Sequence, residues 1–357
     1  MRTIIHPRPN PIVAAMYTLR DMDVDVIVEH GPAGCSFMAS RPLEDADVRV
    51  VTSGMRDNDL VFGGEEPLIN TLKQVEERFH PETVAVVGTC ASMIIGEDMA
   101  KSIKRAGINA NVFPVDCHGC MGDNTRGAIK ALEAGRDAGI IDPQECERQI
   151  SLMKAATRLE KNVGMASKDY IQPAVSPTKM HVCRRIVDVL SGGGRVAVVM
   201  DAKKELAFRF ADMFEAVDRA RRKLGGETLF VANMDPGKGL PRIRNYCAEI
   251  KADLDSHGVV IDRVIGGLDE YSIVGEEMRE AVDGFGPDLT IILGICHAYP
   301  GYGKDDILIT DQPRQLANYL NQGCEWAVGE ISSHTMVMGA HSIVPLETAD
   351  TLREMLE

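Results

Sequence analysis

The sequence lacks an apolar run long enough to cross a membrane, and its first residues lack the apolar core of a secretion signal. It also lacks an excess of positive charge, because its 357 residues carry a formal net charge of −14 at pH 7. A broad nucleic-acid or anionic-membrane surface is therefore disfavoured. We expect a cytoplasmic globular protein that binds neither nucleic acid nor a membrane.

The sequence also lacks a nucleotide-binding loop, although it contains two glycine clusters. Residues 191–194 (Ser-Gly-Gly-Gly) precede the strand expected at 196–200, whereas a dinucleotide-binding loop follows its strand. Residues 237–239 (Gly-Lys-Gly) lack the earlier glycine and the following serine or threonine of an ATP-binding loop. We interpret both clusters as turns and expect this chain to bind no ATP.

A second Cys-x-x-Cys pair is missing as well. The nine cysteines are an odd number and are scattered over a long chain, which indicates free thiols or metal ligands rather than a disulfide scaffold. Cys117-x-x-Cys120 is the one pair with metal-like spacing, so a closed zinc site within one chain is disfavoured. A thioredoxin-like role for this pair stays open.

Short apolar strands alternate along the chain with longer amphipathic stretches, a pattern that is typical of parallel α/β folds. We predict three Rossmann-like domains with parallel sheets, over residues 1–165, 180–265 and 266–357 with a C-terminal helix. A segment with two prolines, at 170–179, is expected to be a linker.

Four cysteines directly follow expected strands, and these differ from the rest in their placement. They are Cys35, Cys90, Cys117 and Cys296. Parallel strands end at the edge of the sheet where α/β proteins bind ligands. Cys35 and Cys90, from one chain, are half of an iron–sulfur site, and a two-fold dimer would supply the other half.

Four motifs in order along the chain resemble the catalytic component of nitrogenase-like reductases. They are His-Gly-Pro-Ala-Gly-Cys-Ser at 30–36, Asp-Asn-Asp-Leu-Val-Phe-Gly-Gly at 57–64, Thr-Cys-Ala-Ser-Met-Ile-Ile-Gly-Glu-Asp at 89–98, and Asp-Cys-His-Gly-Cys-Met-Gly at 116–122. The resemblance is dense over residues 24–127. Heteromeric members carry a further cysteine between the two strand-end ligands, and residues 36–89 contain none. This difference and the opening segment 6–21 are similar to the family members that act on a nickel tetrapyrrole.

The resemblance implies a nitrogenase component 1-like fold and a homodimer that shares a 4Fe–4S cluster. It also implies electrons from a separate, ATP-hydrolysing iron–sulfur reductase with a P-loop. Two ligands per chain, doubled, would fill four iron sites, so our hypothesis is that Cys35 and Cys90 are the ligands, with Cys117 in reserve. Reduction requires protons, and His30, His118 and His297 are the predicted donors because imidazole titrates near neutral pH.

Other interpretations stay open at this point. A scaffold on which a metallocofactor is assembled could use the same cysteines without turnover. A nitrogenase-like reductase of another tetrapyrrole would share the cluster site. A plain nucleotide-binding α/β module would need none of the strand-end thiols.

Overall fold

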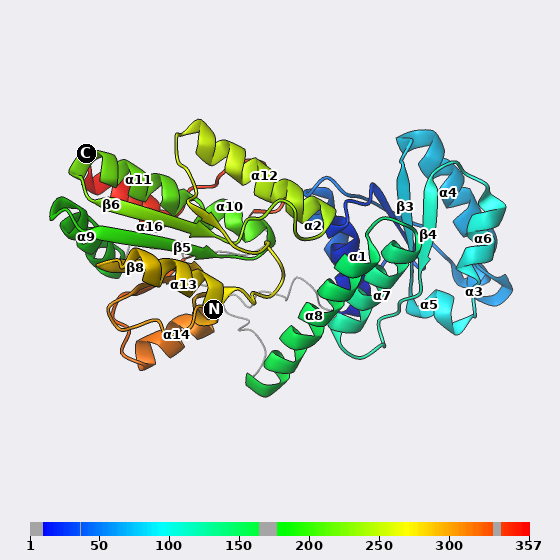
Figure 1. Cartoon of the computed structure of the whole chain (residues 1–357). Helices are drawn as coiled ribbons and strands as arrows, with labels where there is room; N and C mark the ends of the chain where they lie inside the picture. The colour runs from blue at the N-terminus through cyan, green and yellow to red at the C-terminus, as the bar shows by residue number, and fades with distance from the viewer. Residues whose placement is uncertain (1–9, 36, 164–176, 331–336) are drawn as a thin grey trace. The chain divides into compact units, whose positions relative to one another are not determined.

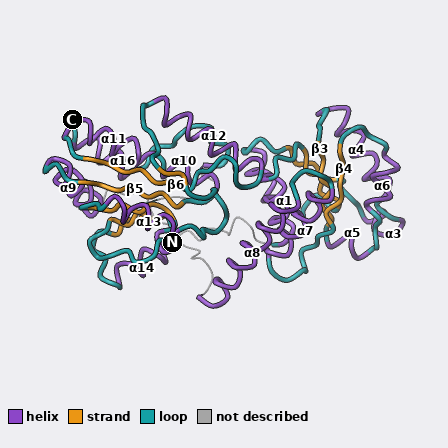
Figure 2. Tube along the Cα trace, viewed as in Figure 1, coloured by secondary structure: helices purple, strands orange, loops and turns teal. Residues whose placement is uncertain are grey.

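The computed structural model describes residues 10–35, 37–163, 177–330 and 337–357. The chain divides into two compact units, which we call the N-terminal unit (Ile5–Leu159 with Leu240–Arg242) and the C-terminal unit (Met1–Ile4, Glu160–Gly239 and Ile243–Glu357). Each unit contains one parallel sheet bordered by helices (Figures 1 and 2). In the described ranges, no helix combines the length and apolarity that a membrane span requires.

The N-terminal unit is built on a four-stranded sheet with the order β2-β1-β3-β4. Its strands are β1 (Val26–His30), β2 (Arg49–Thr52), β3 (Thr83–Gly88) and β4 (Asn111–Val115). Its helices are α1 (Pro11–Asp21), α2 (Phe37–Glu44), α3 (Asp57–Phe62), α4 (Glu65–Phe79), α5 (Cys90–Ile94), α6 (Met99–Ala106), α7 (Asn124–Asp137) and α8 (Pro143–Val163). All strand pairs are parallel, and His30 at the end of β1 is in register with Gly88 at the end of β3.

Helices cover both faces of this sheet. α4 and α6 pack on one face, where Val26, Val84 and Leu72 belong to one buried apolar cluster. α1 and α7 pack against each other and contact β3 and β4 (Figure 1). Their close approach depends on Gly127 of α7, because a Cβ there would lie 1.9 Å from the Pro11 carbonyl oxygen. Helices therefore exclude water from both faces of the sheet. Polar and reactive side chains remain accessible at the carboxyl ends of the strands.

The C-terminal unit is built on a six-stranded sheet with the order β10-β9-β8-β5-β6-β7. Its strands are β5 (Arg195–Asp201), β6 (Glu227–Ala232), β7 (Arg263–Val264), β8 (Leu289–Gly294), β9 (Ile307–Thr310) and β10 (Ala327–Gly329). Its helices are α9 (Pro177–Ser191), η1 (Lys204–Leu206), α10 (Ala207–Phe210), α11 (Asp212–Leu224), α12 (Pro241–Ser256), α13 (Gly275–Phe285), η2 (Cys296–Ala298), α14 (Pro313–Asn321) and α16 (Glu347–Met355).

The parallel α/β class is confirmed, whereas the number of sheets differs from the prediction. The strands expected in separate domains at 180–265 and 266–357 belong to one sheet, because β8 pairs with β5 and places Leu289 opposite Val196. Every residue of β8 is buried, and a fully buried strand needs neighbours on both sides. Strand spacing indicates where strands lie but not which strand edges pair, so the boundary at 265/266 fell inside a sheet. The predicted linker at 170–179 lies mostly outside the described residues, and its last three residues begin α9.

Candidate metal centre

Cys35 and Cys90 follow neighbouring strands of the N-terminal sheet. Cys90 is the first residue of α5, directly after the Thr89 cap, and is half-buried, whereas Cys35 lies on an exposed turn after β1. The Thr89 hydroxyl donates a hydrogen bond of 3.0 Å to the His30 carbonyl oxygen and so joins the two strand ends. Gly31 permits this approach, because a Cβ there would lie 2.3 Å from the Thr89 hydroxyl oxygen.

The surroundings of the Cys35 thiol disfavour its charged form. Burial raises the pKa of Cys35, and the nearby charges of Glu29 and Cys90 raise it further. A bound cation would oppose these effects and favour the Cys35 thiolate.

The turn after β4 brings a second pair of cysteines to the same edge. Cys117 is buried, and burial, with a smaller contribution from Asp116, raises the pKa of its thiol to about 12. Cys120 is exposed, and its Sγ lies 3.8 Å from the Sγ of Cys90. The Gly119 N–H donates to the Cys90 Sγ over 3.2 Å. The predicted reserve ligand Cys117 is thus the inaccessible member of the pair, and Cys120 is the member that lies against Cys90.

His118, between these cysteines, completes a group of three possible ligands. The ligand atoms of Cys90, His118 and Cys120 all lie within 4.8 Å of one another. The His118 ring is half-buried, and its Nδ1 has no hydrogen-bond partner among the described residues. From the sequence, His118 was predicted to be a proton donor, and Cys120 was not among the predicted ligands. The Cys-x-x-Cys spacing of residues 117–120 indicates a metal site, but by itself it does not show which of the two cysteines lies next to Cys90.

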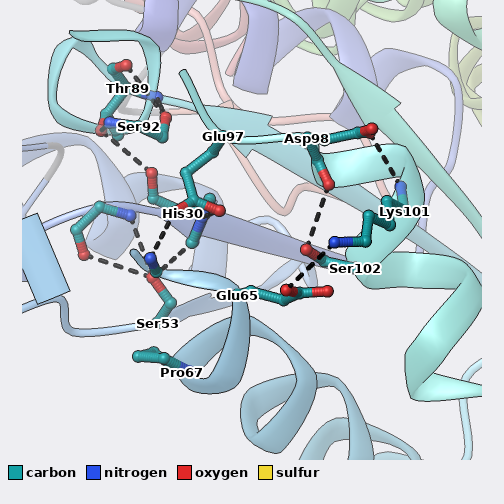
Figure 3. A network of polar contacts seen from close by, with 12 residues as sticks. His30, Ser53, Glu65, Pro67, Thr89, Ser92, Glu97, Asp98, Lys101 and Ser102 are labelled. Carbon is teal, nitrogen blue, oxygen red and sulfur yellow. Dashed lines mark hydrogen bonds and ion pairs between the residues drawn. The ribbon is translucent and has the colours of Figure 1, made fainter. Parts of the chain in front are cut away.

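His30, the last residue of β1, is fully buried and belongs to a polar network (Figure 3). Its Nδ1 lies 3.0 Å from the Ser53 hydroxyl, and its Nε2 lies 3.9 Å from a carboxylate oxygen of Glu97. Burial lowers the pKa of His30, and Glu97 acts in the opposite direction. The other Glu97 oxygen accepts a short hydrogen bond from the Gly64 N–H. His30 therefore connects the loops that follow β1 and β2 to the turn before α6.

His297 and Cys296 belong to the C-terminal unit, where η2 follows β8. Cys296 is buried, its thiol donates to the Ile292 carbonyl oxygen over 3.3 Å, and burial raises its pKa. His297 is half-buried, and burial followed by the charge of Lys203 lowers its pKa. Its Nδ1 is without a hydrogen-bond partner in the described part of the chain. Cys296 is thus a core side chain, and His297 lies in a different unit from the other two predicted donors.

Large apolar side chains are exposed on the helices that follow β2 and β3. On α3, Phe62 is 86% exposed and Val61 is 75% exposed, and on α5, next to Cys90, Ile94 is 77% exposed. Exposed apolar side chains grouped in this way mark an interaction surface. Cys90, the first residue of α5, therefore lies on a helix that offers part of a surface suited to a protein partner.

Comparisons with known proteins identify the family of this chain. The family model for nitrogenase component 1 type oxidoreductases matches residues 11–197. The "Ni-sirohydrochlorin a,c-diamide reductive cyclase complex, component CfbD" of Methanothermobacter thermautotrophicus is 41% identical over 99% of both chains. The protein of the same name from Methanosarcina acetivorans is 43% identical over 99% of this chain and 97% of its own.

A more distant relative matches only part of the chain. The nitrogenase molybdenum-iron protein beta chain of Methanococcus maripaludis is 37% identical over 35% of this chain and 27% of its own length. Because the family model covers more than half of the chain and two relatives align over nearly all of it, this chain belongs to the family of nitrogenase component 1 type oxidoreductases.

Proposed function

We propose that this chain is the catalytic component of a nitrogenase-like complex that reduces and cyclises Ni-sirohydrochlorin a,c-diamide in coenzyme F-430 biosynthesis. The substrate is inferred from the names of the full-length relatives. The observation that carries the chemistry is the placement of accessible Cys35 and Cys90 at the ends of adjacent strands. A separate ATP-dependent iron–sulfur reductase, similar to a nitrogenase iron protein, would supply the electrons.

The thiols fit a 4Fe–4S cluster shared by two copies of the chain. Cys35 and Cys90 would each bind one iron, and the same residues of a second copy would complete the set. The donor set suits iron because thiolates are the ligands of such clusters and both thiols can be reached from solvent. When bound, such a cluster supplies one-electron transfer. The exposed side chains of α3 and α5 would be covered by the second copy.

The chain's own residues would position this centre and deliver protons. His30 is buried and hydrogen-bonded, so we assign it to holding the Cys35 turn in place. His118 and His297 are both half-buried with a buried Nδ1 that has no hydrogen-bond partner among the described residues, and both remain candidate proton donors. Burial lowers the pKa of His297, so its ring would carry a proton only transiently at neutral pH.

The test is anaerobic purification of the full chain with a count of iron and sulfide per dimer. Addition of the partner reductase, ATP and Ni-sirohydrochlorin a,c-diamide should then convert the tetrapyrrole spectrum. An iron-loaded dimer that converts other tetrapyrroles but not this one would instead identify a different reductase. An iron-loaded but inert protein would favour a scaffold for metallocofactor assembly, and a protein that takes up no iron would overturn the proposal.

A further inference from the structure

The ligand atoms of Cys90, His118 and Cys120 have the spacing of a site for a single metal ion. Two thiolates that lie about 2.3 Å from one tetrahedral zinc ion are about 3.8 Å apart. The Sγ atoms of Cys90 and Cys120 are separated by 3.8 Å, and the His118 nitrogen lies within 4.8 Å of both. Thiolates that bind different irons of one cluster are further apart, because the distance between the irons is added. The spacing therefore fits one ion rather than two corners of a cluster.

The surroundings of these three residues also suit a metal ion. The His118 Nδ1 is buried without a hydrogen-bond partner in the described residues, so no hydrogen bond of this nitrogen to any of them holds the ring away from a metal ion. The Gly119 N–H already points at the Cys90 sulfur, which is the type of second contact that orients a thiolate ligand. A side chain at Gly119 would crowd this contact, since its Cβ would lie 3.3 Å from the Cys90 Sγ.

We propose that Cys90, His118 and Cys120 bind one soft divalent ion, Fe²⁺ or Zn²⁺, with tetrahedral geometry and an open fourth position. Binding releases the two thiol protons to solvent, so that two thiolates and one neutral imidazole hold the ion. Cys35 and the buried Cys117 take no part in this site. This single-ion site is inferred only from the positions of Cys90, His118 and Cys120 and does not depend on the proposed function.

Competition with a cluster follows only if the proposed function holds. Cys90 would be a ligand in both sites, so one copy of the chain cannot hold both at once. The single ion would then occupy the protein before a cluster is present, and cluster formation would release Cys120 and His118.

The experiment is a titration of the reduced, chelator-treated full chain with Co²⁺ alone, followed by visible absorption under anaerobic conditions. We expect one Co²⁺ per chain, with the intense ligand-field bands of a tetrahedral site and thiolate-to-cobalt charge transfer. Cys120→Ala should lose part of the charge-transfer intensity and bind Co²⁺ about tenfold more weakly or worse, and His118→Ala should behave similarly. Cys120 is exposed, so its variant should fold normally, and far-UV circular dichroism checks this.

The matched controls are Cys35→Ala and Cys117→Ala, which should bind Co²⁺ with the spectrum of the wild type. Cys120→Ala with an unchanged spectrum and affinity would overturn the proposal, as would loss of the cobalt bands in Cys35→Ala. The proposed function is judged separately by iron and sulfide content, so either idea can fail while the other survives.

Discussion

Cysteines follow strands in both sheets, but two of them are accessible to solvent in the N-terminal unit, whereas the one in the C-terminal unit is buried. In the N-terminal unit, Cys35 and Cys90 follow β1 and β3 and can be reached from solvent. In the C-terminal unit, Cys296 follows β8 and is fully buried against backbone carbonyl oxygens. Both sheets are parallel, and all three thiols follow the end of a strand. The end of a strand is therefore not sufficient for a reactive thiol, because the loop that follows decides whether the side chain turns outward.

The two units also differ in whether charged and apolar side chains near the strand ends are buried or exposed. Asp201 ends β5 and is fully buried, and neither of its carboxylate oxygens has a hydrogen-bond partner among the described residues. The N-terminal unit instead exposes Phe62 and Ile94 beside its thiols. Two thiols at strand ends are therefore accessible to solvent in the N-terminal unit, whereas Cys296 and Asp201 at strand ends of the C-terminal unit are buried. The following variants test this difference.

The largest effect is expected from the strand-end cysteines. Cys35→Ala and Cys90→Ala should each abolish cluster binding, because each removes two of the four proposed ligands from the dimer. Cys296→Ala should keep its iron and lose only about 1 kcal/mol of stability from the smaller core side chain. Iron and sulfide analysis of anaerobically purified protein measures the difference. Full iron content in both N-terminal variants would remove the distinction between the two edges.

Asp201 should make stability depend on pH. Burial raises its pKa from a usual value of 3.8 to about 7, against a smaller opposing contribution from the Ser272 hydroxyl. Since the folded state favours the protonated acid, its stabilisation is full below about pH 4 and is lost as the pH rises to about 7. The difference corresponds to about 4 kcal/mol at most.

The variant Asp201→Asn should remove this dependence. Its free energy of unfolding relative to the wild type, from denaturant titrations, should therefore rise between pH 4 and pH 8. The exposed Asp305 provides the control, since Asp305→Asn should change little over the same range. Parallel pH profiles for Asp201→Asn and the wild type would show that Asp201 is not a buried acid.

A charge on the apolar surface of α3 should weaken the proposed dimer. Phe62→Asp would place a carboxylate in the covered interface, and we expect dimer dissociation to become about 100-fold more favourable. Ile273→Asp, at a 63% exposed position of the C-terminal unit, is the matched change on the other side of the comparison. Sedimentation equilibrium of both variants gives the dissociation constants. Equal weakening by both would mean that the dimer surface is not confined to the N-terminal edge.

The smallest effect is expected from the polar network around His30. Glu97→Gln keeps an oxygen for the Gly64 N–H but removes the negative charge near His30, at a cost of about 1 kcal/mol. The pKa of His30, already low, should fall further because Glu97 is the group that raises it. Nuclear magnetic resonance titration of the ring reports this change. Glu77→Gln on the exposed side of α4 should leave both quantities unchanged, and an unaltered His30 pKa in Glu97→Gln would contradict the pairing.

Much of the fold could be read from the pattern of apolar residues. The runs at β1, β3, β4, β5 and β8 are short, β-branched and separated by amphipathic helices, so their secondary structure and parallel pairing follow from local composition. The pairing of β8 with β5 could not be read in this way, because any buried strand of similar length satisfies the same pattern. The candidate metal centre could likewise be predicted only in part from the sequence. Cys35 and Cys90 were predicted as ligands from their strand-end positions, whereas the spacing of Cys117 and Cys120 did not show which of the two lies against Cys90.

By itself, the sequence determined the parallel α/β class, the cysteines at strand ends and the motifs of residues 24–127, because these depend on local patterns and on residue order. The tertiary structure alone decided which of these groups can act. It buried Cys117 and Cys296, exposed Cys35 and Cys120, and set Cys90 3.8 Å from Cys120. The physical reason is that burial and distance depend on how loops from different strands pack together. Spacing along the chain does not contain that information.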